Sequence, residues 1–502
     1  MKLWNGSGYT NYNPEDTTNR KAFNRFCSAD LPEVSAFYNE ATGFGTEERI
    51  FINGEEAGNE GRAFAHIVTG PNAGTSYELP ALGKFSWENA LANPATGNKT
   101  IVIGTDDSTP GQVYIYIGNK TKNGTEVDKA GLTNGKLYGI SVSGLSTETN
   151  TNIPAVNTAF GLIDLGIVSD SSGASLNTKS NNLGVTNFLR PEDGAWDPVN
   201  PNDFYFVTTN GFTSPSRLWR LHFNDINDMN SGGLISVLLV GTEGPKMMDN
   251  LTIDNSGHIL IQEDPGNQTH IAKIWQYTIA TGEIKEIAHH DPNRFLTGAV
   301  NFLTQDEESS GIIDVQSILG PGKFLLVDQA HYSIAGEVYE GGQILALFNG
   351  DTYNANPEID LYGNGIEIFD GDPNPNPYNN TLFGVTNIGS TVDRTFIIQN
   401  NGVGNLNIQA IHFRGINASS FSLVFPPIFP LNLQVGGSQS FTVRFTPNTT
   451  CLLYTSDAAD ERSSVDLGGR RIIKKKIIKK ELDLKNTQRI DRRYEHHTQR
   501  SH

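Results

Sequence analysis

The segment Ile101-Val102-Ile103-Gly104-Thr105-Asp106-Asp107 is a short apolar run that ends in two carboxylates, and Val113-Tyr114-Ile115-Tyr116-Ile117 follows it after a loop. Runs of β-branched and aromatic residues separated by a turn are typical of two antiparallel strands. The same pattern returns along the chain, with first runs at residues 50–56, 259–264, 324–329 and, without an acid at its end, 204–209. Hairpins that repeat at irregular spacing predict an all-β propeller.

A second acidic series precedes further strand-like stretches of the same units. Its members are Trp87-Glu88-Asn89, Pro191-Glu192-Asp193, Met248-Asp249-Asn250 and Asp306-Glu307-Glu308. In an antiparallel meander, the start of one strand and the end of the next lie at the same edge of the sheet. We therefore expect both acidic series to reach one face of a radial array.

That face would gather many carboxylates, namely Glu55, Glu56, Glu88, Asp106, Asp107, Glu192, Asp249, Glu263, Asp264, Glu307, Glu308 and Asp328. Like charges at close range raise one another's pKa or require cations. Oxygen ligands suit hard ions, above all calcium, which takes about 6–8 of them. The recurrence therefore predicts a metal-binding face. The alternative is that these acids are solvated turn residues, since Asp, Asn and Gly are common in turns.

The chain has 502 residues, which is enough for more than one domain. It has no run of about 18 apolar residues, so we expect no membrane span. The first eight residues lack the apolar run of a signal peptide and begin as if inside a domain. We expect a propeller of six blades, five of them recognisable, with a first blade and any signal peptide missing from this chain.

The composition changes abruptly at Cys451. Residues 451–461 resemble a translated sequencing adaptor, and Lys474-Lys475-Lys476 resembles translated poly-A. We therefore interpret residues 451–502 as an artefactual tail; the alternative is a genuine basic tail that binds nucleic acid or an anionic surface. The tail holds 13 of the 37 Lys and Arg residues and 8 of the 55 Asp and Glu residues. Residues 1–450 then carry 24 basic and 47 acidic side chains, a net charge of −23, which argues against nucleic-acid binding.

The remaining chain divides by pattern into three parts. Residues 1–350 are assigned to the propeller, with a loop-rich start over 1–48 and a Ser/Asn/Thr-rich insertion from Ser143 to Asn182 that we expect to decorate an edge. Residues 351–377 end in a run rich in Asp, Asn and Pro, which predicts a linker. Residues 378–450 predict a β-sandwich of immunoglobulin-like type that stops one or two strands short. Cys27 is the one cysteine before the tail, so we expect no intrachain disulfide.

Four motifs resemble those of the PhoX-type alkaline phosphatases, over about residues 49–350. They are Leu82-Gly83-Lys84-Phe85-Ser86-Trp87-Glu88, Phe188-Leu189-Arg190-Pro191-Glu192-Asp193-Gly194, Asp249-Asn250-Leu251 and Leu260-Ile261-Gln262-Glu263-Asp264. That family comprises exported bacterial phosphomonoesterases with a β-propeller fold, in which carboxylates hold calcium ions and a pair of ferric ions. The resemblance implies a metal site built from Glu55, Glu88, Glu192 and Glu263, with Glu56, Asp107, Asp249 and Asp264 nearby.

The chain departs from the family at its thiol ligand. The family uses a cysteine to help hold the iron pair, whereas Gly54 precedes the first acidic pair here and Gln262 precedes the later one. This difference argues against a dinuclear iron centre and leaves a calcium site. The second domain resembles immunoglobulin-like modules of bacterial surface proteins, through Asn400-Asn401-Gly402 and Phe445-Thr446-Pro447.

Hydrolysis of a phosphate ester needs neutralised phosphoryl oxygens, an activated nucleophile and a stabilised leaving group, all of which several cations can supply. Arg190 beside Glu192, Lys84 near Glu88, and His331 are the candidates to contact a bound phosphate. The alternatives are an ion pair of Arg190 with Glu192 or Asp193, an exposed charge at a strand edge for Lys84, and a structural role for His331. The serine-hydrolase elbow Gly-x-Ser-x-Gly does not occur in the sequence.

The predicted function is that of a calcium-dependent phosphomonoesterase, which hydrolyses small organic phosphate esters outside the cytoplasm as a secreted, periplasmic or surface protein. We expect a monomer without a nucleic-acid partner. The alternative is a non-catalytic, calcium-stabilised surface propeller that binds a glycan or matrix component. The apparent lack of the family cysteine favours this alternative, and the order of the acidic motifs favours the enzyme.

Overall fold

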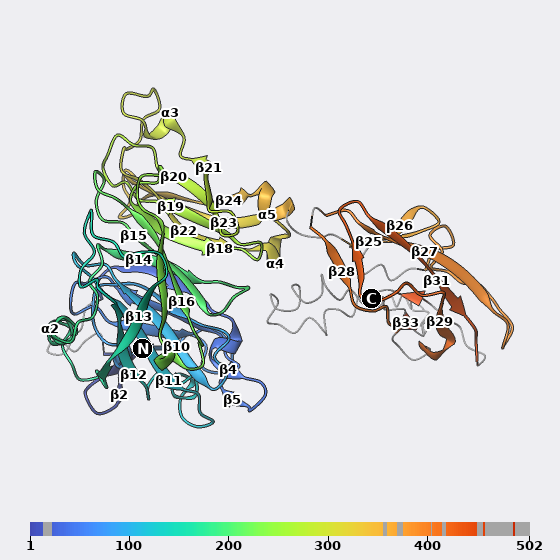
Figure 1. Cartoon of the computed structure of the whole chain (residues 1–502), viewed down its shortest axis with the longest axis horizontal. Helices are drawn as coiled ribbons and strands as arrows, with labels where there is room; N and C mark the ends of the chain where they lie inside the picture. Colours follow the sequence, from blue (N-terminus) through green and yellow to red (C-terminus); the bar gives the residue numbers. More distant parts are fainter. Residues whose placement is uncertain are drawn as a thin grey trace, which may run out of the picture. The chain divides into compact units, whose positions relative to one another are not determined.

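The computed structural model describes residues 1–13, 23–354, 359–368, 375–402, 404–413 and 418–448, together with the short strands β32 (Thr455–Ser456) and β33 (Lys485–Asn486). The chain divides into two compact units: Met1–Gln316 with Lys323–Asn349, and Ser317–Gly322 with Gly350–His502. Strands make up most of the regular structure in each unit (Figure 1). Among the described residues, no helix has the length and apolar character needed to cross a membrane.

The first unit is built mainly from antiparallel strands, with β1 and β8 paired in parallel. Its first sheet contains β1 (Lys2–Trp4), β2 (Tyr9–Asn11), β3 (Phe26–Asp30), β6 (Ile50–Glu55), β7 (Ala63–Ile67) and β8 (Ser76–Glu78). A continuous sheet follows, made of β9 (Trp87–Ala92), β10 (Lys99–Asp106), β11 (Val113–Asn119), β12 (Lys136–Val142), β13 (Thr158–Gly166), β14 (Pro191–Trp196), β15 (Asp203–Thr208), β16 (Arg217–Phe223) and β17 (Gly233–Leu239). The last two sheets contain β18 (Met248–Ile253), β19 (His258–Glu263), β20 (Lys273–Thr278) and β21 (Glu283–His289), and then β22 (Glu307–Asp314), β23 (Lys323–Ser333) and β24 (Glu340–Phe348).

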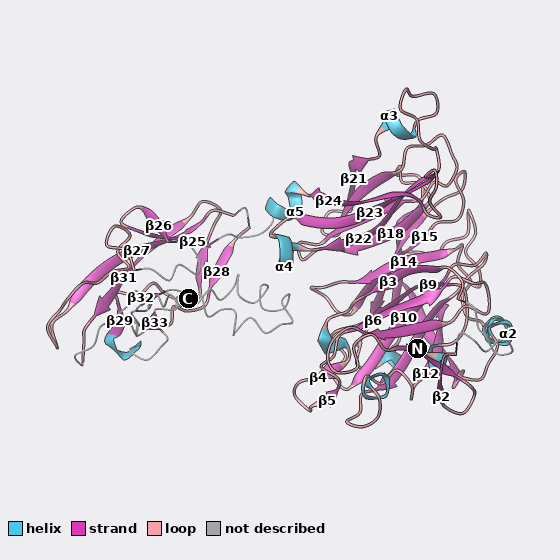
Figure 2. Ribbon diagram, turned by 180° about the vertical axis from the view of Figure 1, so that it is seen from behind, coloured by secondary structure: helices cyan, strands magenta, loops and turns pink. Residues whose placement is uncertain are grey.

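Five edge strands of these sheets, β3, β9, β14, β18 and β22, contact one another in that order. Figure 2 shows β18, β14 and β9 following one another through the first unit. Apolar side chains fill the space between successive sheets; for example, Val207 and Leu218 pack against Leu251 and Ile261. This arrangement confirms the all-β prediction and is propeller-like, while the six blades of the prediction remain a prediction.

The helices are short and lie between strands. They are α1 (Glu126–Lys129), α2 (Gly173–Leu183), α3 (Pro292–Phe295), α4 (Gln316–Leu319) and α5 (Gly350–Asn354). The start of the chain, predicted as loop-rich, contains β1 to β3, a 3-10 turn at Val34–Ala36, and the hairpin β4 (Tyr38–Asn39) and β5 (Phe44–Gly45). The insertion predicted to decorate an edge contributes β13, which joins β12 to β17 and thereby makes the second sheet continuous.

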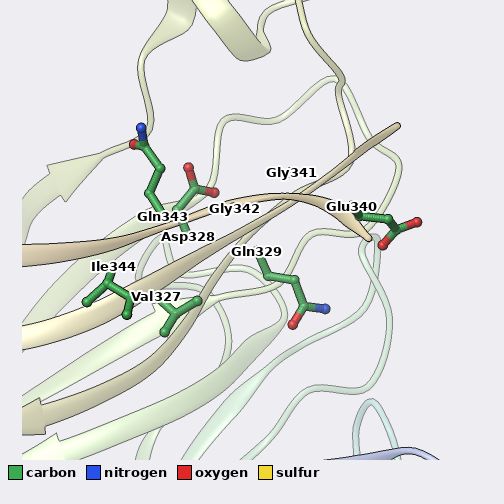
Figure 3. A pocket seen from close by; sticks show the side chains of 8 residues that line it. All are labelled: Val327, Asp328, Gln329, Glu340, Gly341, Gly342, Gln343 and Ile344. Carbon is green, nitrogen blue, oxygen red and sulfur yellow. The ribbon is translucent and has the colours of Figure 1, made fainter. Parts of the chain in front are cut away.

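The register of the last hairpin differs from the sequence alignment of the repeats. Strand β23 continues through Asp328 as far as Ser333, and Glu307 pairs with Ala330. Figure 3 shows Asp328 beside its cross-strand partner Gln343, on the opposite side of the β23–β24 hairpin from Val327 and Ile344. The residue that follows Ala330, the partner of Glu307, is His331, three positions beyond Asp328, the acid that the pattern predicted.

In the second unit, a larger and a smaller sheet pack around one core. The larger sheet has the order β26-β25-β27-β31-β29, and the smaller one pairs β28 with β30. Their bounds are β25 (Ile359–Gly363), β26 (Ile366–Ile368), β27 (Val392–Asn400), β28 (Leu406–Ile408), β29 (Phe421–Val424), β30 (Leu431–Leu433) and β31 (Ser438–Phe445). Leu406 and Leu433 of the small sheet pack with Phe396 and Phe441 of the large one, as in a sandwich.

The segment predicted as a linker contributes part of this sandwich. Strands β25 and β26 lie within residues 351–377, and β25 pairs with β27 over five residues. The alternation of Ile359 and Leu361 gives this stretch an apolar face that packs against the core, which the nearby Asp, Asn and Pro residues hid in the composition. Residues 355–358 and 369–374 of the predicted linker and nearly all of the predicted artefactual tail lie outside the described residues.

Candidate metal centre

The five contacting edge strands each present a chemically reactive side chain at their second position. These residues are Cys27, Glu88, Glu192, Asp249 and Glu308, on β3, β9, β14, β18 and β22. Because these strands begin at the same end of their sheets and contact one another, equivalent positions converge. The carboxylates of Glu88, Glu192 and Asp249 are buried.

Two groups of ligand atoms are close enough to hold a metal ion. The first group contains Glu88, Glu192 and Asp249, and the second contains Cys27, Glu56 and Glu88. Within each group the ligand atoms lie within 4.8 Å of one another. Glu88 belongs to both groups, so the two candidate positions are adjacent and share a carboxylate.

The third residues of the same strands tie the strands together by hydrogen bonds. The Ser28 hydroxyl donates to Glu88 at 2.7 Å, and the Asn250 amide donates to Ser28 at 2.7 Å. The Asn89 amide donates to Asp193 at 2.6 Å. These bonds connect β3 with β9 and β18, and β9 with β14, so the strands that carry the candidate ligands are held as one rigid unit.

We call the five second-position residues Cys27, Glu88, Glu192, Asp249 and Glu308 the first ring. A second ring of side chains comes from the strand that pairs with each edge strand. In each sheet, the first residue of the edge strand pairs with a residue of the neighbouring strand, and the next residue along that strand belongs to the second ring. The members are Glu56, Asp107, Thr209, Asp264 and His331. Arg190 joins the two rings, because its guanidinium donates two hydrogen bonds to Asp107, at 2.7 and 2.8 Å, and lies 2.9 Å from Glu192. Two cations therefore lie among the carboxylates: Arg190, whose side chain is 30% exposed, and Arg25, which forms an ion pair with Glu56.

The acids immediately before the second ring have structural partners instead. Glu55 forms an ion pair with Arg62, with two hydrogen bonds of 2.7 and 2.8 Å. Glu263 accepts hydrogen bonds from Trp275 at 2.9 Å and from the amide of Lys246 at 2.8 Å, and it contacts His270 at 2.7 Å. Neighbouring residues of an extended chain point to opposite sides, so only one member of each acidic pair can face the centre.

Of the predicted metal ligands, the structure therefore brings together Glu56, Glu88, Asp107, Glu192, Asp249 and Asp264 and separates Glu55 and Glu263 from them. Of the predicted phosphate contacts, Arg190 lies in the site, and His331 lies beside it, 3.8 Å from Glu308 and 2.6 Å from Glu340. The ammonium of Lys84 lies 3.8 Å from Glu60. Asp328 lies 3.7 Å from the buried His290.

Cys27 is a candidate ligand that the sequence-based prediction did not include. The resemblance places the family cysteine at position 54 or 262, but both positions have other roles here. A Cβ added to Gly54 would lie 2.2 Å from Cβ of Trp87, and Gln262 donates a hydrogen bond to Ser309 at 2.7 Å. The thiol comes from β3, which pairs with β6, the strand that contains Gly54. A signal for Cys27 is present in the sequence. The triplet Phe26-Cys27-Ser28 has the same order of apolar residue, candidate ligand and polar residue as Trp87-Glu88-Asn89 and Met248-Asp249-Asn250. The prediction that residues 1–48 are loop-rich left this triplet out of the repeat pattern.

Burial and mutual repulsion dominate the electrostatics of the site. Burial, with the nearby charges of Asp107 and Asp193, raises the pKa of Glu88 to about 8. Burial and the charges of Asp249, Asp107 and Glu88 likewise raise the pKa of Glu192, which Arg190 only partly offsets. Burial and the charge of Asp264 raise the pKa of Glu308 to about 7. Groups with such shifts either hold protons at neutral pH or bind cations.

The donor atoms fit metal ions of two kinds. Glu88, Glu192 and Asp249 offer only oxygen, which suits a hard ion such as calcium. The group with Cys27 adds a sulfur atom, which suits iron or another transition metal better than calcium. The sequence-based argument against iron rested on the lack of a thiol near the acidic pairs. That argument does not hold, because the Cys27 thiol lies with Glu56 and Glu88.

These pKa shifts predict how the metal-free protein responds to pH. A carboxyl whose folded-state pKa lies above its unfolded value, as for Glu88 at about 8 against 4.5, retains a proton in the folded state that the unfolded state has released. The free energy of unfolding then falls as pH rises through that window. We expect the melting temperature of chelator-treated protein to fall by several degrees from about pH 5 to about pH 8, and calcium at the higher pH to restore it. A melting temperature that rises over this range would contradict the buried cluster.

Comparison with known proteins gives the chain a family. The model of the family alkaline phosphatase PhoX matches residues 15–313. Among solved structures, the chain is similar to PhoX from Pseudomonas fluorescens in complex with vanadate, a transition-state analogue, at 15% identity and a TM-score of 0.44, over 58% of each chain. It is also similar to the GH74 xyloglucanase from Xanthomonas campestris, at 11% identity and a TM-score of 0.29, over 65% of this chain and 46% of that one.

No curated protein sequence matches the chain. The chain spans 58% of the length of the Pseudomonas fluorescens protein. The family match covers more than half of the 502 residues and contains Cys27, Glu88, Glu192, Asp249 and Arg190. The chain therefore belongs to the alkaline phosphatase PhoX family.

Proposed function

We propose that this protein hydrolyses phosphate monoesters with the help of metal ions held at the convergence of β3, β9, β14, β18 and β22. The observation that carries the proposal is the shared carboxylate of Glu88, which joins an all-oxygen group to a group that contains the Cys27 thiol. The name of the family, alkaline phosphatase, supports the same reaction class. Small organic phosphate esters and a location outside the cytoplasm are part of this proposal.

The residues that would hold the metal ions are Glu88, Glu192 and Asp249 in one position, and Cys27, Glu56 and Glu88 in the other. Calcium is proposed for the oxygen group and a transition metal, iron among the candidates, for the group with sulfur. When bound, such ions neutralise charge on phosphoryl oxygens and lower the pKa of an attacking water.

Arg190 is proposed to bind the phosphoryl group. Its guanidinium is fixed by Asp107 and Glu192, yet 30% of the side chain remains exposed, so it can meet a ligand without moving far. A planar guanidinium suits phosphate because two of its N–H groups can donate in parallel. His331, whose pKa is lowered by burial but raised further by Glu340, Asp306 and Glu308, is proposed to stay protonated beside the site and attract the same anion.

The non-catalytic alternative loses its main support in this structure. It was favoured by the apparent lack of the family cysteine, and Cys27 now lies with Glu56 and Glu88. Arg190, whose side chain is 30% exposed between the two rings of carboxylates, also offers a cation to a phosphoryl group, for which a binder of glycan or matrix has no evident need. The phosphatase is therefore the function that the geometry supports best.

The test is hydrolysis of an aryl phosphate by the full chain, with calcium and iron supplied and then with a chelator. We expect metal-dependent turnover, and we expect Glu192→Gln to lower kcat/KM by about 10²–10³-fold, because it removes a charged ligand from the oxygen group. Asp164→Asn is the matched control, since Asp164 pairs with Lys136 on the exposed surface. Absence of turnover, combined with a calcium-induced rise in melting temperature, would point to a structural propeller instead.

A further inference from the structure

A buried ion pair lies behind the loop that carries Arg190. The side chains of Glu148 and Arg217 are 0% and 2% exposed, and they contact each other at 2.5 Å. Arg217 is the first residue of β16, whereas Glu148 comes from the insertion after β12. Burial of two charges costs desolvation free energy that pairing only partly offsets. The contacts of this pair therefore indicate which part of the structure it holds in place.

The second carboxylate oxygen of Glu148 accepts a hydrogen bond from the backbone next to Arg190. Its Oε2 accepts a hydrogen bond of 2.8 Å from the amide of Leu189, and its own amide donates at 2.8 Å to the carbonyl of Asn187. Arg217 in turn donates to the carbonyl of Asn150 at 2.9 Å, which fixes the segment that carries Glu148. The ion pair is thus bonded to the loop at positions one and three residues before Arg190.

Arg190 has an unusual backbone conformation that needs such support. Its φ is +59°, a left-handed value that side chains other than glycine rarely adopt. Residues of this kind persist where the surroundings determine the conformation. Here the amide of Thr209 donates to the Arg190 carbonyl at 3.0 Å, and Glu148 secures the preceding residue. The left-handed turn aims the guanidinium at Asp107 and Glu192.

We propose that Glu148 and Arg217 form a positioning pair that holds Arg190 in the conformation that binds the phosphoryl group. Neither residue touches the carboxylate rings; both act through Leu189 and the turn at Arg190. The inference rests on the proposed function, because it takes Arg190 to be the phosphate-binding residue. A pair that only stabilised the fold would affect the melting temperature and leave phosphate binding unchanged.

The same hairpin offers a matched control pair. Asp203 and Arg220 lie 2.7 Å apart at the other end of β15 and β16, and Asp203 is 4% exposed. Thr208 pairs with Arg217 at the site end, whereas Asp203 pairs with His222 at the far end. The variant Asp203→Asn therefore removes a buried charge from the same hairpin without touching the loop of Arg190.

The decisive variant is Glu148→Leu combined with Arg217→Met, which removes both charges and leaves neither unpaired. We expect it to fold, to retain its metal content, and to raise KM for an aryl phosphate about tenfold with kcat changed about twofold at most. Glu148→Gln keeps an oxygen for the Leu189 amide, so its KM should stay within about threefold of the original value although its melting temperature falls. Asp203→Asn should lower the melting temperature and leave KM unchanged.

Binding of inorganic phosphate, measured by calorimetry, separates failure of this inference from failure of the proposed function. If the unmodified protein binds phosphate without turnover, the proposed phosphatase function is wrong. The phosphate affinities of the variants then still test whether Glu148 and Arg217 position Arg190. Unchanged KM and phosphate affinity in the double variant would overturn the inference alone, and absence of both turnover and phosphate binding in the unmodified protein would overturn both. If the double variant does not fold, Glu148→Asp, which keeps the charge but withdraws it from Leu189, takes its place with the same expectation for KM.

Discussion

Replacement of Glu88 by glutamine is expected to lower kcat/KM for an aryl phosphate by about 10³-fold, the largest effect of any single change in this protein. Among the described residues, Glu88 is the carboxylate shared by both groups of ligand atoms, so its loss is expected to weaken two metal positions at once. The measurement is turnover together with metal content, determined by mass spectrometry on the purified variant. We expect the variant to lose both calcium and the second metal together with its activity.

The matched control for Glu88→Gln is Glu126→Gln. Glu126 is also buried, but it pairs with Lys129 at 2.9 Å and with Thr46, away from the converging strands. It should lose stability and keep its metal. Because burial raises the pKa of Glu88 to about 8, Glu88→Gln should instead stabilise the metal-free protein at about pH 8, where the original side chain begins to ionise. Retained metal and activity in Glu88→Gln would refute the shared-ligand arrangement.

Replacement of Cys27 by serine is expected to remove the transition metal selectively and to lower kcat/KM by about 10²-fold. A serine hydroxyl is a hard and weakly acidic donor, so it replaces a thiolate poorly at a metal that prefers sulfur. The oxygen group of Glu88, Glu192 and Asp249 does not contain Cys27, and calcium binding should persist. Metal content and activity are measured on the same preparation.

Cys451→Ser is the control for replacement of a thiol by a hydroxyl, since Cys451 is the second of the two cysteines and lies beyond the family match, which ends at residue 313. It should leave both metals and the activity unchanged. A Cys27→Ser variant with full activity and unaltered metal content would show that the thiol is not a ligand, and the site would then hold calcium alone.

Sequence reasoning went furthest where the pattern is local. The alternation of apolar and polar residues in runs such as 101–107 predicts strands, and the acids at their ends predict convergence on one face, because both follow from the period of two and from antiparallel pairing. Glu88, Glu192 and Asp249 stand at the second position of their strands, and the structure brings them together. The same reasoning could have included Cys27 through the triplet that it shares with them.

Sequence reasoning failed where the outcome depends on which side of the chain a residue faces. Glu55 and Glu56 are neighbours of identical chemistry, yet Glu55 pairs with Arg62 and only Glu56 reaches the Cys27 thiol. The length of β23 is a second case, since the strand runs past Asp328 and brings His331 into the position that the acidic pattern assigned to Asp328. Register and facing are set by partners distant in the chain, so local composition does not reveal them.

The sequence by itself determined that this protein is built from β-hairpins, that its carboxylates recur at strand ends, and that its motifs resemble those of a phosphatase family. These properties follow from short-range periodicity, which every residue carries in its immediate neighbours. Only the tertiary structure decided that a thiol from β3 joins Glu56 and Glu88, and that Glu148 and Arg217 stand behind Arg190. Those contacts join residues separated by about thirty to seventy positions, and only the packing of whole sheets brings such residues within bonding distance.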